Sequence, residues 1–333
     1  MICEDDRPFA LIYTTAFVNL LHELNPNYKI PSFETLKNFL DVHLATSKKE
    51  LIQLISTLNY YSITLDLWTS IAHHHYIIYT LHYIKDFKIH KRILACEEVP
   101  NIVVDHLVIV RFMETLMVKY NLKKELIIKI ISDAGANVKK AIEIFGGGKL
   151  HCLGHVINLV CQDALTKIEK IREKTRIVIK YFNQSSNAMG QFREIQKSDN
   201  LENDFADVIY ALHNEVLTRW NSTFYMFNRI ILLSDCINDA LDLCGKSELA
   251  FTPEELDIIT GFMKLLEPLE KATRILSGDT YVTASLIIPT LKECILDIKE
   301  QTIENDEVIK FQKELLEGLS NRCEQFFIDD NLR

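Results

Sequence analysis

Apolar and polar positions alternate with two different periods along the chain, and the change of period separates helical from strand-forming segments. Residues 9–24 carry apolar side chains at helical spacing, and an Asn-Pro-Asn turn at 25–27 ends that pattern. A second helix is predicted to begin after Ser32, a typical N-cap residue, and to extend through 47–58. Residues 1–58 are therefore expected to form an N-terminal helical region.

The period of the pattern then shortens to two. Three segments rich in β-branched and aromatic residues are joined by short polar connections, which is typical of an antiparallel meander, and they lie at 60–70, 74–84 and 88–99. A helical pattern follows at 105–122. The nearly continuous apolar run at 125–133 then predicts a strand that is covered on both faces.

The next segments are a short helix at 137–145 stopped by three glycines, a short strand within 149–154, and a helix at 155–168. The order β-β-β-α-β-α-β-α is that of a ribonuclease-H-like α/β core, in which a meander and parallel crossovers share a mixed five-stranded sheet. Later helices are predicted at 169–195, 203–217, 222–246, 253–277 and 283–326. The sequence therefore predicts this core at 59–168 and an all-helical domain at 169–333.

Composition narrows the class of protein. Hydrophobic residues make up 48% of the chain and charged residues 25%, which is ordinary for a globular protein. The longest apolar runs fall far short of the roughly 20 residues that span a bilayer, so no membrane partner is expected. The acidic start lacks the positive charge of a secretion signal, so the eight scattered cysteines are expected to be reduced thiols.

The net charge of −9 changes the expectation for nucleic-acid binding. Proteins that bind DNA alone usually carry a basic face, because neutralising phosphates supplies much of the affinity. The densest basic stretch here, 167–180, mixes Glu with Lys and Arg at helical spacing, and we interpret it as a solvated helix face. If the chain contacts DNA, most of the affinity is expected from outside it.

Two carboxylates are the main candidates for chemistry. Asp66 lies in the middle of the first predicted strand and Asp133 ends the fourth. Those strands are parallel neighbours in a ribonuclease-H-like sheet, so both side chains should converge at one edge, where they could bind Mg²⁺ or Mn²⁺ for phosphoryl transfer. The alternative is that Asp66 faces solvent and Asp133 is an ordinary turn residue.

Five histidines cluster in the predicted meander, at positions 73, 74, 75, 82 and 90. Imidazoles at such density invite a metal interpretation. No carboxylate or cysteine partner is evident from the spacing, so we interpret these residues as sheet surface.

Six blocks along the chain, in order, resemble the hAT superfamily of DNA transposases and the zinc finger BED domain-containing proteins derived from them. The blocks lie at 8–32, 63–70, 131–142, 151–165, 215–230 and 266–291, and include the run Arg-Trp-Asn-Ser-Thr. The resemblance implies that Asp66 and Asp133 match the first two acids of an Asp-Asp-Glu triad. It also implies that the helices after residue 169 form the family's insertion domain.

The same resemblance assigns roles to two further pairs of residues. Cys152 and His155 match a Cys-x-x-His signature near the active site, with a helix start that contacts the core as the alternative. Arg219 and Trp220 match the position at which family transposases stack a tryptophan on an extruded base. The alternative for Trp220 is a buried side chain that anchors a helical domain.

The departures from the family pattern shape the functional expectation. The third acid, the C-terminal dimerisation segment and the N-terminal BED zinc finger are not matched, so the core is expected to be incomplete and its acids vestigial or incomplete. Zinc would bind only through that finger. The expected function is a nuclear, transposase-derived protein without catalytic activity that binds DNA or regulates transcription.

Two alternatives stay open at this point. One is an active metal-dependent DNA transposase or nuclease, completed by a Glu from elsewhere. The other is an acidic helical scaffold that binds protein partners or forms a homo-oligomer.

Overall fold

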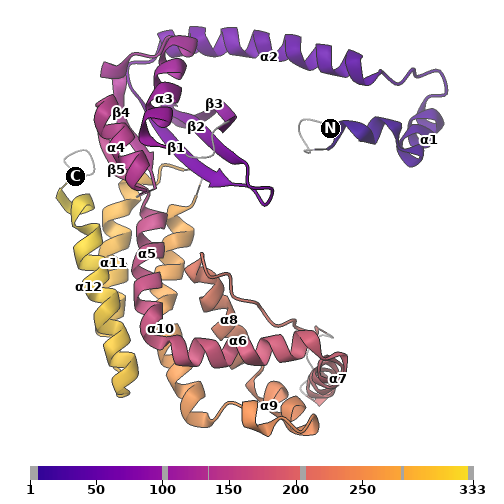
Figure 1. Cartoon of the computed structure of the whole chain (residues 1–333), viewed down its shortest axis with the longest axis vertical. Helices are drawn as coiled ribbons and strands as arrows, with labels where there is room; N and C mark the ends of the chain where they lie inside the picture. Colours follow the sequence, from indigo (N-terminus) through magenta and orange to yellow (C-terminus); the bar gives the residue numbers. More distant parts are fainter. Residues whose placement is uncertain (1–6, 100–103, 134, 203–207, 279–280, 329–333) are drawn as a thin grey trace.

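The computed structural model describes residues 7–99, 104–133, 135–202, 208–278 and 281–328. A five-stranded sheet with flanking helices lies at one end of the molecule, and a group of longer helices extends from it (Figure 1). Among the described residues, no helix is both long and apolar enough to cross a lipid bilayer.

The sheet has the order β3-β2-β1-β4-β5. Its strands are β1 (Tyr61–Thr69), β2 (His75–Lys85), β3 (Lys88–Val99), β4 (Ile127–Ser132) and β5 (Lys149–His151). The first three strands pair antiparallel, whereas β4 pairs parallel with both β1 and β5. This mixed sheet confirms the predicted ribonuclease-H-like core.

One face of the sheet is packed against helices. Strand β1 alternates between buried residues such as Ile63 and Leu65 and more accessible ones such as Asp66. The buried side chains share a core with α3 (His106–Tyr120) and α4 (Ala136–Phe145). Because successive side chains of a strand point to opposite faces, Asp66 faces away from these helices.

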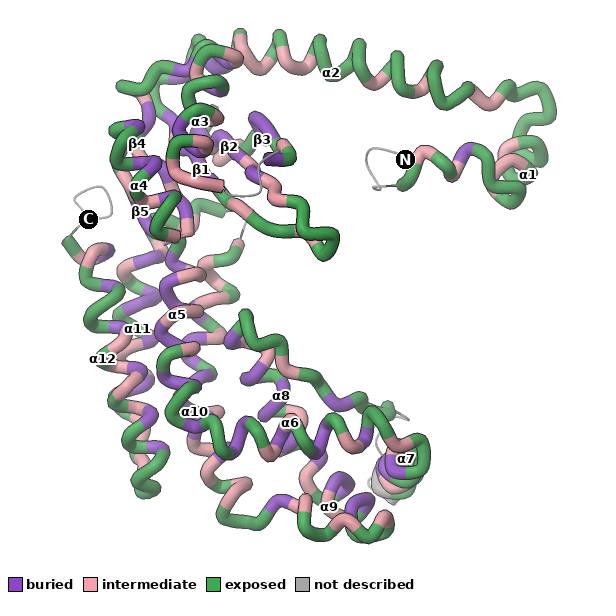
Figure 2. Tube along the Cα trace, in the orientation of Figure 1, coloured by how far each residue is buried: buried purple, intermediate pink, exposed green. Residues whose placement is uncertain are grey.

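The N-terminal region forms the predicted helices. Helix α1 (Thr15–Leu24) follows the 3₁₀ turn η1 (Phe9–Tyr13), and α2 (Phe33–Ser56) begins where Ser32 Oγ accepts a hydrogen bond from the Thr35 N–H at 3.1 Å. Helix α2 extends away from the sheet and carries α1 at its far end (Figure 1). Both helices are largely exposed (Figure 2), and Ile55 is the buried residue of α2.

The chain after β5 is helical. Its elements are α5 (Leu153–Leu165), η3 (Thr166–Ile168), α6 (Glu169–Gln184), α7 (Ser186–Glu202), α8 (Trp220–Leu232), α9 (Ser234–Leu243), η4 (Ser247–Leu249), α10 (Pro253–Leu276), η5 (Ala284–Leu286), α11 (Ile287–Glu300) and α12 (Asp306–Ile328). One continuous core links side chains from Leu150 to Phe326. Helix α5 belongs to this core, although it directly follows the sheet. The two predicted domain boundaries, after residues 58 and 168, stay predictions.

The prediction of a helix at 203–217 was wrong for the part that the structure describes. Residues 208–216 form an extended segment without regular structure, while 203–207 lie outside the described residues. The backbone of Tyr210 is bonded to a side chain instead of a helix: its N–H donates to Gln196 Oε1 at 2.8 Å, and its carbonyl accepts from Gln196 Nε2 at 3.2 Å. Such side-chain bonds compete with helix formation.

Helices α10 and α12 approach each other closely. A Cβ added at Gly261 of α10 would lie 2.8 Å from Cγ2 of Val308 on α12. Next to this contact, the rings of Phe262 and Phe311 meet edge to face with centroids 4.9 Å apart. Both rings are fully buried. This aromatic pair joins the last described helix to the centre of the helical core.

Candidate metal and nucleic-acid site

The two predicted acids are brought to one edge of the sheet. Strands β1 and β4 are parallel neighbours in which Leu65 pairs with Ser132. The residue that follows each of these two is an acid: Asp66 follows Leu65 within β1, and Asp133 follows Ser132 at the end of β4. Asp66 is exposed and Asp133 is half-buried. The predicted convergence is therefore present in the backbone register.

The charge of Asp133 acts on the Asp66 carboxyl group. Loss of solvent contact raises the pKa of Asp66, and the negative charge of Asp133 raises it further. The Leu67 N–H, which donates to Asp66 Oδ1 at 3.0 Å, and the nearby His155 oppose this rise in pKa. Mutual repulsion of this kind is what a bound cation would relieve.

Asp133 also serves as a turn residue. Its Oδ1 accepts a hydrogen bond from the Gly135 N–H at 3.2 Å, and its carbonyl oxygen accepts one from Ser132 Oγ at 3.0 Å. These contacts lie at the start of α4, as the turn interpretation of Asp133 expects. The metal interpretation concerns the same carboxylate and is compatible with them. The turn does not remove the carboxylate from the edge that it shares with Asp66.

The Cys-x-x-His pair lies at the same edge. Cys152 is the exposed N-cap residue of α5, and its N–H donates to the Ser132 carbonyl at 2.7 Å, next to Asp133. His155 is half-buried in the first turn of α5 and lies close enough to Asp66 to influence its pKa. The pair therefore starts a helix beside the acids, as its alternative interpretation holds.

His151 was not singled out from the sequence, although it precedes Cys152 directly. It ends β5, is 9% exposed, and its Nδ1 has no hydrogen-bond partner among the described residues. Burial lowers its pKa, and the positive charges of Lys139 and Lys149 lower it further. The lowered pKa favours the neutral imidazole near pH 7.

The donor set can be tested against the metals that the resemblance implies. Over residues 7–99, 104–133, 135–202, 208–278 and 281–328, no group of three His, Cys, Asp or Glu side chains is arranged to hold a metal ion. Asp66 and Asp133 supply carboxylate oxygens, which suit Mg²⁺ or Mn²⁺. The pair fits part of such a site, and the nearby Cys152 and His155 do not complete a zinc site.

The pKa of Asp66 leads to a prediction on stability. Its folded-state pKa lies above the unfolded value, so folding favours the protonated acid, and the protein loses stability as pH rises through that raised pKa. Asp66→Asn should therefore raise the free energy of unfolding at pH 7, by less than about 1 kcal/mol because the group is exposed. At pH 3 the gain should vanish.

Thermal melts at both pH values, with and without MgCl₂, check this prediction. Mg²⁺ should stabilise the wild type more than the variant. Asp41→Asn, at an exposed acid on α2, serves as the matched control and should change little at either pH. A variant that is less stable than the wild type at pH 7 without Mg²⁺ would contradict the expectation.

Helix α5 connects the acids to the predicted nucleic-acid residues. One turn after His155, Asn158 Oδ1 accepts a hydrogen bond from the Trp220 N–H at 3.1 Å. One turn further, Gln162 Nε2 donates to the Leu217 carbonyl at 2.8 Å. His155, Asn158 and Gln162 share a helix face at spacings of three and four residues. The turn that carries Arg219 therefore lies along the helix that starts at the acids.

Arg219 and Trp220 differ sharply in exposure. Arg219 is the exposed N-cap residue of α8, whereas Trp220 is 1% exposed and meets Phe224 with ring centroids 6.4 Å apart. The burial favours the anchoring alternative for Trp220. Stacking of Trp220 on an extruded base would require the ring to be uncovered, and it stays a prediction. The indole Nε1 is buried with no partner among the described residues.

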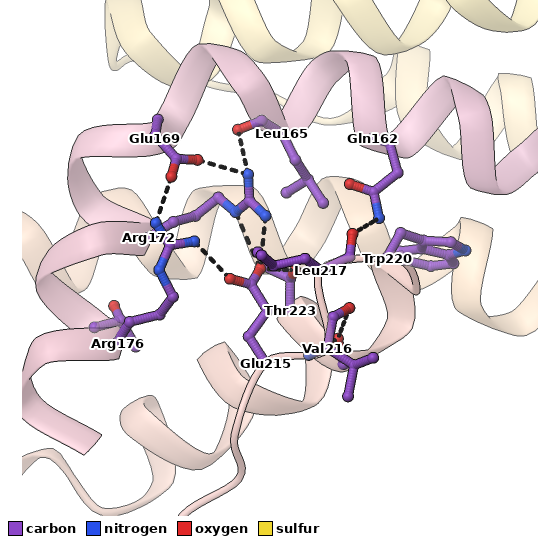
Figure 3. Close-up of polar contacts among 12 residues, drawn as sticks. Gln162, Leu165, Glu169, Arg172, Arg176, Glu215, Val216, Leu217, Trp220 and Thr223 are labelled. Atoms are coloured by element: carbon purple, nitrogen blue, oxygen red, sulfur yellow. Dashed lines mark hydrogen bonds and ion pairs between the residues drawn. The ribbon is translucent and has the colours of Figure 1, made fainter. Parts of the chain in front are cut away.

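A buried ion cluster precedes Arg219 (Figure 3). Arg172 and Arg176 of α6 both point toward Glu215, whose side chain is 1% exposed. The interpretation of 167–180 as a solvated helix face was wrong for Arg172, whose side chain is 6% exposed. Its buried partner, Glu215, lies 43 residues along the chain. Local spacing could not reveal it.

The histidines of the meander bind separate partners. His74 Nδ1 lies 2.5 Å from Glu98 Oε1, His75 Nδ1 lies 2.9 Å from Thr69 Oγ1, and His82 Nε2 lies 3.1 Å from Thr64 Oγ1. The ring of His90 stacks on Tyr83. The expectation that no carboxylate partner exists was wrong for His74. These separate contacts are those of a sheet surface.

The fold and the site together define a class of protein: a ribonuclease-H-like sheet with two acids at the edge of its parallel strands, joined through α5 to a helical module. The family described as the ZBED1 RNase-like helical domain matches residues 150–259. Over most of its length the chain is a distant homologue of the hAT (AC) transposases and of zinc finger BED domain-containing proteins.

Three relatives show the extent of this similarity. A Zea mays protein named as an AC transposase is 26% identical over 98% of this chain, and one named as an AC9 transposase is 27% identical over 84%. Zinc finger BED domain-containing protein 6 of Homo sapiens is 24% identical over 90% of this chain. The chain spans 42%, 38% and 32% of the lengths of these three relatives, respectively.

Proposed function

We propose that this chain is the core of a nuclear, transposase-derived protein that binds DNA and does not cleave it by itself. The observation that carries the proposal is the arrangement along α5, with Asp66 and Asp133 at the start of the helix and Arg219 beside its later turns. Carboxylates that share a divalent cation and an exposed arginine are both groups that bind a phosphate backbone. The similarity to proteins named as transposases supports DNA as the polymer.

The distribution of charge supports DNA contact at the sheet. Residues 59–152 contain twelve Lys and Arg against nine Asp and Glu, whereas the rest of the chain contains twenty-five against thirty-seven. A phosphate backbone would therefore meet less repulsion at the sheet than at the helices. With a net charge of −9, the chain should bind DNA weakly, and its affinity should fall further as the salt concentration rises.

The absence of cleavage is proposed from the ligand set. Two-metal phosphoryl transfer needs acids that hold both ions in reacting geometry. In the part of the chain that the structure describes, two acids meet at the site and no third metal-binding group joins them. One weakly held cation would position DNA without activating water at a second centre.

One experiment tests both parts of this proposal. The protein is incubated with supercoiled plasmid in Mg²⁺ or Mn²⁺, and the DNA is analysed by native gel for binding and, after protein removal, for nicks. We expect a salt-sensitive shift in mobility and no nicking above a buffer control. Asp66→Ala and Asp133→Ala should weaken the metal-dependent part of the shift.

A second candidate function is an active nuclease or transposase, favoured by the mutual influence of Asp66 and Asp133. Metal-dependent nicking by the wild type that disappears in both alanine variants would establish it and overturn the proposed lack of cleavage. A plasmid that neither shifts nor nicks at low salt would remove DNA binding by this chain.

A further inference from the structure

The segment just before Arg219 is held by an unusually complete set of buried polar contacts. Glu215 Oε1 accepts hydrogen bonds from Arg172 Nε at 3.1 Å and Nη2 at 2.8 Å, and Oε2 accepts one from Arg176 Nη1 at 2.7 Å. The hydroxyl of Thr223 on α8 also donates to Oε1. We call Glu215, Arg172, Arg176 and Thr223 the clamp. Both carboxylate oxygens of Glu215 are used, and the partners come from two helices (Figure 3).

The two arginines of the clamp form further bonds within α6 and to the last residue of α5. Arg172 Nη1 donates to Glu169 Oε2 at 2.7 Å and to the Leu165 carbonyl at 3.2 Å, and Arg176 Nη2 pairs with Glu169 and Glu173. These additional bonds orient each guanidinium independently of its contact with Glu215. Buried ion pairs of this kind add little net stability compared with apolar packing, but their geometry admits few alternative arrangements.

The turn that follows Glu215 has further hydrogen bonds of its own. The Arg219 N–H donates to the Val216 carbonyl at 2.9 Å, and Ser222 Oγ accepts from the Val216 N–H at 2.8 Å and donates to the Arg219 carbonyl at 2.6 Å. On the other side, Gln162 holds the Leu217 carbonyl. Residues 215–220 are therefore bonded to α5, α6 and α8 at once.

The same turn leaves its side chains outside the core. Val216 is 51% exposed and Leu217 is 65% exposed, and Arg219 is exposed as well. A buried carboxylate that holds an exposed turn contributes little to the hydrophobic core at that point. The bonds of residues 215–220 instead bear on the position of the exposed side chains relative to α5, and therefore relative to the acids at the start of α5.

We propose that the clamp is a positioning device: it holds the 216–219 turn against α5 and so sets the place of the Arg219 guanidinium relative to the edge that carries Asp66 and Asp133. Glu215 is the positioning residue, because every clamp bond ends on its carboxylate. This inference rests on the proposed DNA binding for the role of Arg219, but the holding of the turn can be tested without DNA.

The first test uses hydrogen exchange measured by mass spectrometry. Glu215→Gln keeps the size of the side chain but removes its charge, and should speed exchange of the peptide that covers 214–220 by about tenfold or more. Exchange within α10 reports the stability of the whole fold and should speed up by a clearly smaller factor than exchange of 214–220. Thr223→Val, which removes one hydroxyl, should give a smaller change in the same peptide and covers the case in which Glu215→Gln fails to fold.

The matched control is a second ion pair on the same helix. Lys174 Nζ lies 2.5 Å from Glu255 Oε2 and donates to the Ala250 carbonyl at 2.7 Å. Lys174→Met should leave exchange at 214–220 unchanged. Uniform acceleration across all helices in Glu215→Gln, or unchanged exchange at 214–220 in both clamp variants, would overturn the clamp as a device that holds the turn.

The second test is a double-mutant cycle on affinity for duplex DNA, with Glu215→Gln and Arg219→Ala. Each single change should weaken binding by about tenfold, and the double variant should be no weaker than Arg219→Ala alone. Additive losses would overturn positioning of Arg219, even if exchange shows that the turn is held. Wild type that does not bind DNA would remove the proposed function and leave the exchange result as the test of the clamp.

Discussion

Glu215→Ala is expected to lower the free energy of unfolding by about 3 kcal/mol. Removing one partner of a buried ion pair typically costs about 3–5 kcal/mol, because the other charge is left buried without its partner. The lower end applies here because Arg172 keeps its bonds to Glu169 and to the Leu165 carbonyl. The cost should exceed that of any single exposed ion pair in the molecule, which is about 0–1 kcal/mol.

The pH dependence of this loss has a defined sign. Burial raises the pKa of Glu215, but hydrogen bonds from Thr223, Arg176 and Arg172 outweigh it and hold the pKa below its usual value. A carboxylate with a depressed folded-state pKa stabilises the fold above its unfolded pKa, near 4.3, and ceases to do so as pH falls through the folded value. The difference between wild type and Glu215→Gln should therefore shrink as pH falls below the unfolded pKa and through the lower folded-state pKa.

Urea unfolding followed by circular dichroism measures both effects. The control is Glu248→Ala, at an exposed residue whose carboxylate lies 3.2 Å from Lys246 Nζ, and its loss should be far smaller than that of Glu215→Ala, because water screens this pair. A loss for Glu215→Ala no larger than that of the control would show that the guanidinium groups find solvent or other partners at little cost.

Phe311→Ala should be similarly damaging, for a different reason. The ring is fully buried against Phe262, and truncating a buried phenylalanine costs about 3–5 kcal/mol from lost transfer energy and a residual cavity. The neighbouring contact between Gly261 and Val308 already brings α10 and α12 close together, so the helices have little room to collapse into the space left by the ring. The estimate therefore belongs to the upper part of that range.

The same unfolding assay checks this expectation, with Ile309→Ala as the control on α12. Ile309 is 41% exposed and should lose less than about 1 kcal/mol. Equal losses for the two variants would mean that α12 is not packed into the helical core as the structure shows.

The sheet was the part most readily predicted from sequence. Alternating β-branched and aromatic residues report burial on one face of a strand, and the same alternation placed Asp66 opposite Ile63 and Leu65. Ser32 marked the start of α2, because capping is a local interaction. The convergence of Asp66 and Asp133 followed from the order of strands. Their register agrees with it.

The helical module was predicted less well, because its decisive contacts are not local. A charged stretch with helical spacing looks the same whether its arginines face water or a buried carboxylate, so Arg172 and Glu215 could not be paired from sequence. The extended course of 208–216 depends on Gln196, a residue of the preceding helix. The break at Leu233, which divides the predicted helix 222–246 into α8 and α9, carries no proline or glycine to mark it.

Helix α5 has a mechanical consequence for anything that binds along it. From His155 to Gln162 it rises about 10 Å, at 1.5 Å per residue, and it is bonded to the acid edge at one end and to the 216–219 turn at the other. A rod of that length that tilts by about 10° displaces its far end by about 2 Å, and misplacement by 1 Å is already enough to spoil a reacting or binding geometry. The acid edge and Arg219 therefore share one alignment, and a change that tilts α5 alters both together.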